Sequence, residues 1–354
     1  MRRYFGLKCI SLQRYTKMSK KLAIYILLLL FPGVFAATAQ SDWRTPQASS
    51  IQNGPSAENL RAEVEFFCDS LRQGRGRGSA GHADAAIYIA QRLRDAGCYS
   101  LGGSYSHSFT VSTDGAPGHN IMGVLKCAKW NSGRYIIVGA HYDGLGVING
   151  TLYPGADSNA SGVAAMLEIA HSFRRQLGSG YSYSGNILFV AFDSYVDGRE
   201  GSQSLWNSIV RGELTDPNTG SRIRPADIIM MVDLDQIGST LAPVNPNRKD
   251  FVIALGEKSL LKPGSKTLLD RCNSFYDINL DIQRSYYGSD NFTDVFYSKL
   301  GDRRVFIRAG IPTMYFTSGI TETTNKRSDT ASSLDYEVLQ RRTTLIFRFL
   351  EKSF

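Results

Sequence analysis

The sequence predicts an α/β protein, a three-layer sandwich in which helices flank both faces of a central, mostly parallel mixed sheet. Two observations predict this class. Short apolar segments alternate along the chain with segments whose apolar residues recur at helical spacing. The stretches that connect them are too short to link independent domains. With 354 residues, 42% of them apolar and 20% charged, the chain is long enough to bury a large core.

The expected helices begin after capping residues and end at glycine or polar segments. They cover Ser56–Leu71, Ala80–Ala96, Ser161–Gln176, Lys258–Asn273 and Tyr336–Glu351. The expected strands are short and rich in Val, Ile, Leu and Phe. They cover Asn120–Leu125, Tyr135–Ala140, Asn186–Phe192, Ile228–Leu234, Phe251–Ala254 and Thr313–Phe316. The glycine-rich stretch Gln73–Gly81 follows no strand, so we interpret it as a loop rather than a phosphate-binding motif.

Residues 1–39 have the pattern of a secretory signal peptide. A cationic start at Met18 precedes an apolar run from Leu22 to Phe31, and small residues end at Ala39, before Gln40. We expect cleavage near Ala39/Gln40, a true start at Met18 and a periplasmic or secreted protein with one domain over residues 40–354. The alternative is a retained single anchor, but the apolar run has about half the length that a bilayer-spanning helix needs.

The net charge of +8 comes almost entirely from this first segment. It holds seven of the 40 Lys and Arg residues and none of the 32 Asp and Glu residues, so the remainder carries 33 cations against 32 acids. A nucleic-acid-binding role therefore loses its main support, and the mature chain contains no apolar run long enough to span a membrane.

Four cysteines lie in the exported part, and an oxidising compartment permits disulfides. A chain of this size does not need them for stability, and no C-x-x-C motif indicates a thiolate metal or redox site. Buried free thiols are the simpler interpretation, although the sequence leaves the disulfide state open for Cys68, Cys98, Cys127 and Cys272.

Polar residues follow two of the expected strands, and another lies in a loop between a strand and a helix. His141 and Asp143 come after the strand that ends at Ala140, Asp157 lies in a tight loop before a helix, and Asp235 follows Leu234. Each has an ordinary structural explanation when taken alone, as a satisfied histidine, a helix cap or a turn residue. In α/β sheets, however, ligands bind at the carboxyl ends of strands, and one His with two Asp is a ligand set suited to zinc.

The sequence resembles the co-catalytic zinc aminopeptidase family, which also includes glutaminyl cyclases and the transferrin-receptor ectodomain. The resemblance starts at GRGSAGHADAAIYIA (76–90) and implies a zinc-exopeptidase-like fold over nearly all of the mature chain. Its further segments are GAHYDGLG (139–146), PGADSNASGVAAMLEIA (154–170), ILFVAFD (187–193), VDLDQIG (232–238), GSDNF (288–292), AGIPTMYFTSG (309–319) and SDT (328–330).

The resemblance implies a metal site in which His141, Asp157 and Asp235 are ligands and Asp143 supports the histidine. It also shows where this chain departs from the family. Two consecutive glutamates, a general base and a ligand, are replaced by Tyr195 and Val196, and a ligand histidine is replaced by Asn325. The ligands of one ion are present and those of the other are not, so we expect one zinc ion or none.

These departures predict a pseudoenzyme candidate, an exported aminopeptidase-like protein that is weakly active or inactive. Tyr195 is a poor base, because a phenol titrates near pH ~10, but it can donate a hydrogen bond. Two alternatives stay open. An active aminopeptidase that acts on peptide or protein N-termini would need a substitute base, for which Asp197, Glu200 and Glu322 are near in sequence. A metal-free peptide- or protein-binding domain is the other.

Overall fold

The computed structural model describes residues 54–128, 132–242, 247–257 and 267–354. All of them belong to one compact unit. The expected signal peptide lies outside the described residues, so its cleavage stays a prediction. Among the helices of the described part, none is long and apolar enough to cross a membrane.

One mixed eight-stranded sheet forms the centre of the molecule, in the order β1-β2-β6-β3-β7-β10-β8-β9. Its inner strands β6, β3, β7 and β10 are parallel, whereas β1, β2 and β8 pair antiparallel with their neighbours β2, β6 and β10. The strands are β1 (Ser106–Thr110), β2 (Pro117–Leu125), β3 (Tyr135–His141), β6 (Asn186–Phe192), β7 (Ile228–Leu234), β8 (Phe251–Leu255), β9 (Asp281–Gln283) and β10 (Thr313–Thr317).

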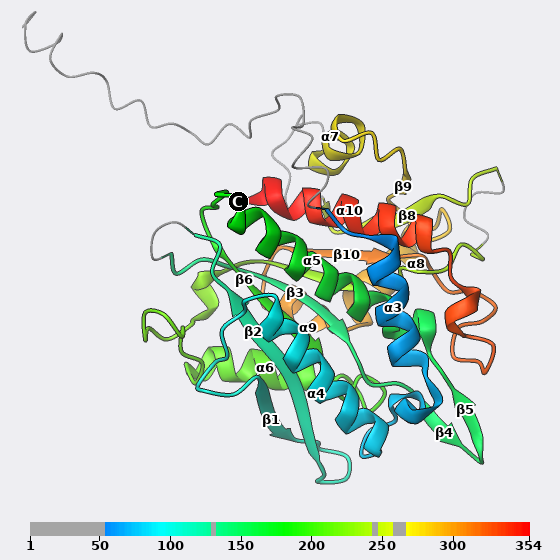
Figure 1. Cartoon of the computed structure of the whole chain (residues 1–354), viewed down its shortest axis with the longest axis horizontal. Helices are drawn as coiled ribbons and strands as arrows, with labels where there is room; N and C mark the ends of the chain where they lie inside the picture. Colours follow the sequence, from blue (N-terminus) through cyan, green and yellow to red (C-terminus); the bar gives the residue numbers. More distant parts are fainter. Residues whose placement is uncertain (1–53, 129–131, 243–246, 258–266) are drawn as a thin grey trace, which may run out of the picture. The chain divides into compact units, whose positions relative to one another are not determined.

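Helices cover both faces of this sheet, which confirms the predicted three-layer α/β class. The α-helices are α3 (Ala57–Cys68), α4 (Ala80–Asp95), α5 (Ser161–Gly178), α6 (Glu200–Arg211), α7 (Leu268–Phe275), α8 (Asp290–Asp294), α9 (Arg304–Arg308) and α10 (Tyr336–Ser353). Helices α3, α4, α5 and α10 gather on one side of the sheet (Figure 1). Short helical turns are η1 (Ser70–Arg75), η2 (Ala156–Ala160), η3 (Pro225–Asp227), η5 (Val295–Lys299) and η6 (Ala331–Ser333).

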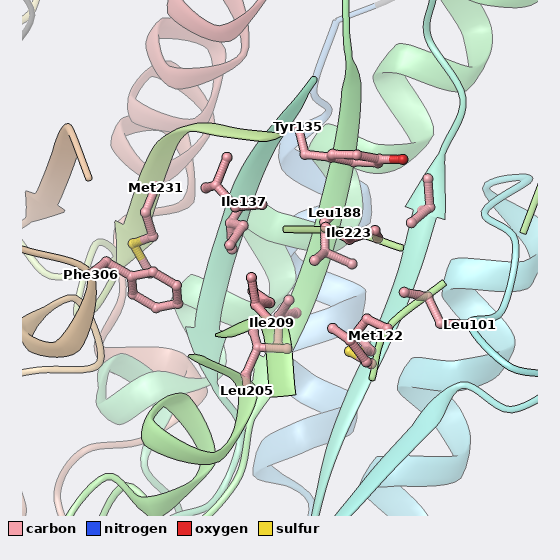
Figure 2. Close-up of a cluster of buried hydrophobic side chains, with 14 of the residues drawn as sticks. Leu101, Met122, Tyr135, Ile137, Leu188, Leu205, Ile209, Ile223, Met231 and Phe306 are labelled. Atoms are coloured by element: carbon pink, nitrogen blue, oxygen red, sulfur yellow. The ribbon is translucent and has the colours of Figure 1, made fainter. Parts of the chain in front are cut away.

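The opposite face of the sheet packs against α6 and α9. Leu205 and Ile209 of α6 and Phe306 of α9 are buried against strand residues that include Ile137 and Met231 (Figure 2). Both faces of the inner strands are therefore apolar, and β3 and β6 are buried along their whole length. Burial on both faces explains why the central strands read as continuous apolar runs.

Several elements escaped prediction because their sequences are too polar. Strand β1 reads SHSFT and pairs only at the sheet edge, and α6 reads EGSQSLWNSIVR, with few apolar positions. The hairpin of β4 (Gly146–Ile148) and β5 (Thr151–Tyr153) lies outside the central sheet. The helix expected over Lys258–Asn273 is present as α7 from Leu268, and residues 258–266 lie outside the described residues.

The four cysteines are free thiols in the structure. Cys98, Cys127 and Cys272 are buried, and Cys68 is half-buried. Desolvation raises the pKa of Cys272 to about 12, which keeps this thiol protonated and unreactive at neutral pH.

Candidate functional site at the carboxyl ends of the central strands

Three adjacent parallel strands bring the candidate residues together. Strand β3 lies between β6 and β7 and ends at His141. Tyr195 follows β6 by three residues, and Asp235 follows β7 directly. Because carboxyl ends of parallel strands share one edge, these residues converge although about 40 to 90 positions separate them in the sequence.

His141, Tyr195 and Asp235 form one compact group. The tyrosine ring stacks on the imidazole, with ring centroids 3.8 Å apart and an interplanar angle of 9°. Its hydroxyl donates to Oδ2 of Asp235 at 3.2 Å, while Nε2 of His141 lies 3.5 Å from Oδ1 of the same carboxylate. The expectation that Tyr195 donates a hydrogen bond is confirmed, and its partner is an expected metal ligand.

The charges of this group support one another. Burial alone would lower the pKa of His141, but the hydrogen bond and charge of Asp235, with Asp143, raise it to about 9. Burial opposes ionisation of Asp235, yet His141, Arg303 and the Tyr195 hydroxyl hold its pKa below the usual range. Burial and the Asp235 charge raise the pKa of Tyr195 well above that of a free phenol. At neutral pH the tyrosine is therefore a neutral donor.

Asp143 supports His141 differently from the expectation. Nδ1 of His141 lies 3.0 Å from the backbone carbonyl oxygen of Asp143 and 3.7 Å from its carboxylate. The carboxylate instead accepts the backbone N–H of Val196 at 3.0 Å. The carbonyl thus orients the ring, and the side chain of Asp143 fixes the loop after β6.

Asp157 is the one expected ligand that does not join the group. Its Oδ1 accepts from the backbone N–H of Gly238 at 2.6 Å and from Ser161 at 2.9 Å, and its Oδ2 accepts from Ser318 at 3.0 Å. It is 1% exposed. Three donors converge on this buried carboxylate, so Asp157 links the η2 turn to two neighbouring loops. Within the described residues, the expected three-ligand arrangement is not formed.

The residue after it, Ser158, faces Asn325. Its hydroxyl accepts from Nε2 of Gln236 at 2.8 Å and lies 3.4 Å from Oδ1 of Asn325. Ser158 therefore lies opposite Asn325, where the resemblance implies a replaced histidine. The side chains of Ser158, Gln236 and Asn325 are neutral hydroxyl and amide groups, which are weak metal ligands.

The acids considered as substitutes are engaged elsewhere. Asp197 accepts from Nε of Arg77 at 2.5 Å, and Glu200 accepts from the hydroxyl of Ser112. Glu322 is exposed. The geometry brings neither Asp197 nor Glu200 to His141 and Asp235.

The donor set does not fit the two zinc ions that the resemblance implies. Within the described residues, no three or more His, Cys, Asp and Glu side chains are grouped so that they would hold a metal ion. His141 and Asp235 are together, but Asp157 is saturated with hydrogen bonds, Val196 has no donor atom, and Asn325 offers only an amide. The number of bound ions stays a prediction.

Sequence reasoning missed two buried residues behind the site. Arg303 pairs with Asp233 at 2.7 Å and lies over the ring of Tyr315. Asp302 is 1% exposed, and burial, with the charge of Asp233, raises its pKa to about 8. The sequence signal was three consecutive charged residues in the segment LGDRRVF, a pattern that is typical of a solvated turn.

A family comparison identifies the class of protein. The model of peptidase family M28 matches residues 120–350, well over half of the chain, so the chain belongs to peptidase family M28. It is also 40% identical over 230 residues to the uncharacterized protein YfbL of Escherichia coli, a match that covers 60% of this chain and 64% of that protein. The chain thus spans less than two thirds of this relative.

Solved structures share the fold at low sequence identity. The LapA aminopeptidase of Legionella pneumophila is 17% identical, with a TM-score of 0.59 over 86% of this chain and 73% of that chain. A zinc aminopeptidase of Bacillus subtilis is 12% identical, with a TM-score of 0.60 over 84% and 95%. The glutaminyl cyclase of Porphyromonas gingivalis is 19% identical, with a TM-score of 0.59 over 85% and 99%. At these identities the likeness establishes the fold alone.

Proposed function

We propose that this chain is an exported M28-family protein that binds peptide or protein N-termini and hydrolyses them weakly or not at all, with one zinc ion at most. The observation that carries the proposal is the Tyr195 side chain, which stands at the general-base position, stacks on His141 and donates a hydrogen bond to Asp235. Export is supported by the signal-peptide pattern of residues 1–39.

The chemistry of this position argues against efficient hydrolysis. A general base must accept a proton from water, whereas the Tyr195 hydroxyl is a donor whose pKa is raised far above the working range. The next position offers no help, because the Val196 side chain is apolar and half exposed. Loss of a positioned base alone costs roughly 10²–10⁴-fold in rate.

Peptide binding has support of its own beside the group. A cavity of about 390 Å³ opens against Asp143 and Val196 and is bounded on other sides by Leu145, Val147 and Arg77. Val147 and Val196 are each 51% exposed. An apolar side chain next to a peptide backbone matches this mixture of apolar wall and polar edge.

The two alternatives differ in what supports them. An active peptidase with a rebuilt site would need Asp197 or Glu200 as base. Asp197 lines the cavity but is paired with Arg77, and Glu200 accepts a hydrogen bond from Ser112. A metal-free binding domain agrees with the hydrogen-bonded state of His141, Tyr195 and Asp235. Metal analysis combined with an aminoacyl-amide assay on the purified protein separates them.

The test is steady-state kinetics on leucine and other aminoacyl amides, with zinc, manganese or cobalt added, beside the Bacillus subtilis zinc aminopeptidase as reference. We expect turnover at least ~100-fold below the reference. An Asp235→Asn variant purified in parallel measures contaminating peptidase. Turnover of ~1–10³ per second that disappears in Asp235→Asn would overturn the proposal.

A further inference from the structure

The Tyr195 side chain has a second consequence, which concerns the metal rather than the base. We propose that His141 and Asp235, with Tyr195 stacked on the imidazole and bonded to the carboxylate, lack the ligands that an ion needs, so that the native chain binds no zinc at this group. The inference rests on the proposed function and sharpens its "one ion at most" to none.

The spacing of His141 and Asp235 is the first step. Two ligands about 2.0–2.1 Å from a tetrahedral zinc ion lie roughly 3.4 Å apart. Nε2 of His141 and Oδ1 of Asp235 are 3.5 Å apart, longer than a good hydrogen bond and close to that value. This pair of residues therefore keeps a metal-compatible spacing, and the cause of exclusion must be sought in what surrounds it.

The surroundings supply no third protein ligand. Zinc sites with an open position use three protein ligands. Asp157, the expected third, has both carboxylate oxygens bonded to Gly238, Ser161 and Ser318. Recruiting it would leave buried donors without partners, which costs about 1–3 kcal/mol for each donor.

Tyr195 engages the second oxygen of the Asp235 carboxylate and adds no charged ligand of its own. Its hydroxyl donates to Oδ2 of Asp235, so both oxygens of that carboxylate already face a protein group. Its ring covers one face of the imidazole, with the two ring centroids 3.8 Å apart. The guanidinium of Arg199 lies 5.0 Å from the centroid of the tyrosine ring. A neutral phenol and a nearby guanidinium lie where the resemblance implies the carboxylate of a general base, which makes the position unfavourable for a divalent cation.

Zinc binding to the purified full chain tests the inference directly. We expect less than about 0.1 equivalent retained by the wild type after dialysis against micromolar zinc, and the same for Tyr195→Phe, which keeps the ring. Tyr195→Glu should bind one equivalent, because it opens the space and adds the third ligand to His141 and Asp235.

Matched controls separate the ligand from the change in size. Tyr195→Gln has the shape of the glutamate variant without its charge, and Val196→Glu adds a carboxylate at the exposed neighbouring position. We expect zinc to bind Tyr195→Glu at least ~100-fold more tightly than either, measured by chelator competition. Cobalt absorption reports the ligand set, and thermal unfolding shows that each variant is folded.

Two results would overturn the inference. One is a wild type that holds one tight zinc ion lost in Tyr195→Phe, which would make Tyr195 a ligand. The other is a wild type whose zinc is lost only in His141→Ala or Asp235→Asn. Neither result touches the proposed function if turnover stays low. Conversely, efficient turnover by a zinc-free, chelator-resistant wild type would refute the proposed function and leave the inference standing.

Discussion

Two regions of the site lie side by side and differ in how fully their polar groups are bonded. The η2 segment around Asp157 is saturated: Arg75 donates to the carbonyl oxygens of Phe67, Tyr142, Pro154 and Gly155, and Asp329 accepts the N–H groups of Asp157 and Ser158. The group of His141, Tyr195 and Asp235 is held by fewer contacts: the bond of Tyr195 to Asp235, the bond of His141 to the Asp143 carbonyl, one long ion pair and a ring stack.

The difference separates residues that shape the loops from residues that face the strand ends. In the saturated segment each change would leave buried polar groups unbonded. The side chains of Tyr195, Val196 and Asn325 make fewer such bonds. The presence of Asp157 is therefore explained by the fold of the loop and carries no weight for a metal.

The largest effect is expected where bonding is densest. Arg75→Met removes four hydrogen bonds to buried carbonyl oxygens from a side chain that is fully buried. We expect a loss of about 4–6 kcal/mol in the free energy of unfolding, or no folded protein, since each unbonded buried group costs about 1–3 kcal/mol. Urea unfolding measures it, with the surface change Arg61→Met as control. A loss below about 1 kcal/mol would contradict the interpretation that these carbonyl oxygens depend on Arg75 for their hydrogen bonds.

Introducing the family residues at Tyr195, Val196 and Asn325 tests whether Asp157 or Ser158 faces a histidine at position 325. The variant Tyr195→Glu/Val196→Glu/Asn325→His keeps Asp157 but leaves Ser158 between Gln236 and position 325. We expect little gain in aminoacyl-amide hydrolysis from it, and roughly 100-fold or more when Ser158→Asp is added. Equal gain by the triple variant would show that Asp157 turns to serve as a ligand after all.

The sequence predicted the strands of the core and most helices because their apolar pattern is strong, and β6 and β7 match residue for residue. It also located His141, Asp235 and Tyr195, because strand ends are readable in parallel sheets. It did not predict that Asp157 is hydrogen-bonded inside its own turn while the next residue, Ser158, faces Asn325. Which of two adjacent residues faces a site depends on the backbone conformation of a short turn. Hydrophobic periodicity predicts side-chain direction in helices and strands but not in turns.

Asp157→Asn should produce a folding effect without a metal effect. The amide keeps one acceptor oxygen but turns an N–H₂ group toward a donor, either Ser318 or the pair of Gly238 and Ser161. We expect a loss of about 2–3 kcal/mol in unfolding free energy. Zinc content should equal that of the wild type. A zinc content that falls while stability is unchanged would mean that Asp157 is a ligand rather than a link between the η2 turn and its neighbouring loops.

The smallest effect concerns the sparsely bonded group and appears only over an interval of pH. Folding raises the pKa of His141 from 6.5 to about 9, mainly through Asp235 acting against burial. A raised pKa means that the folded state binds the proton more tightly, so this contribution is complete below pH 6.5 and is lost as the pH rises through 9. We expect the wild type to lose roughly 1–3 kcal/mol more than His141→Gln between pH 6.5 and 9. Urea unfolding across this interval measures the difference, and a two-dimensional NMR titration of the His141 ring gives the pKa directly. Parallel stability profiles for the two proteins, or a His141 pKa near 6.5, would show that Asp235 does not hold the imidazolium and that Tyr195 alone organises the group.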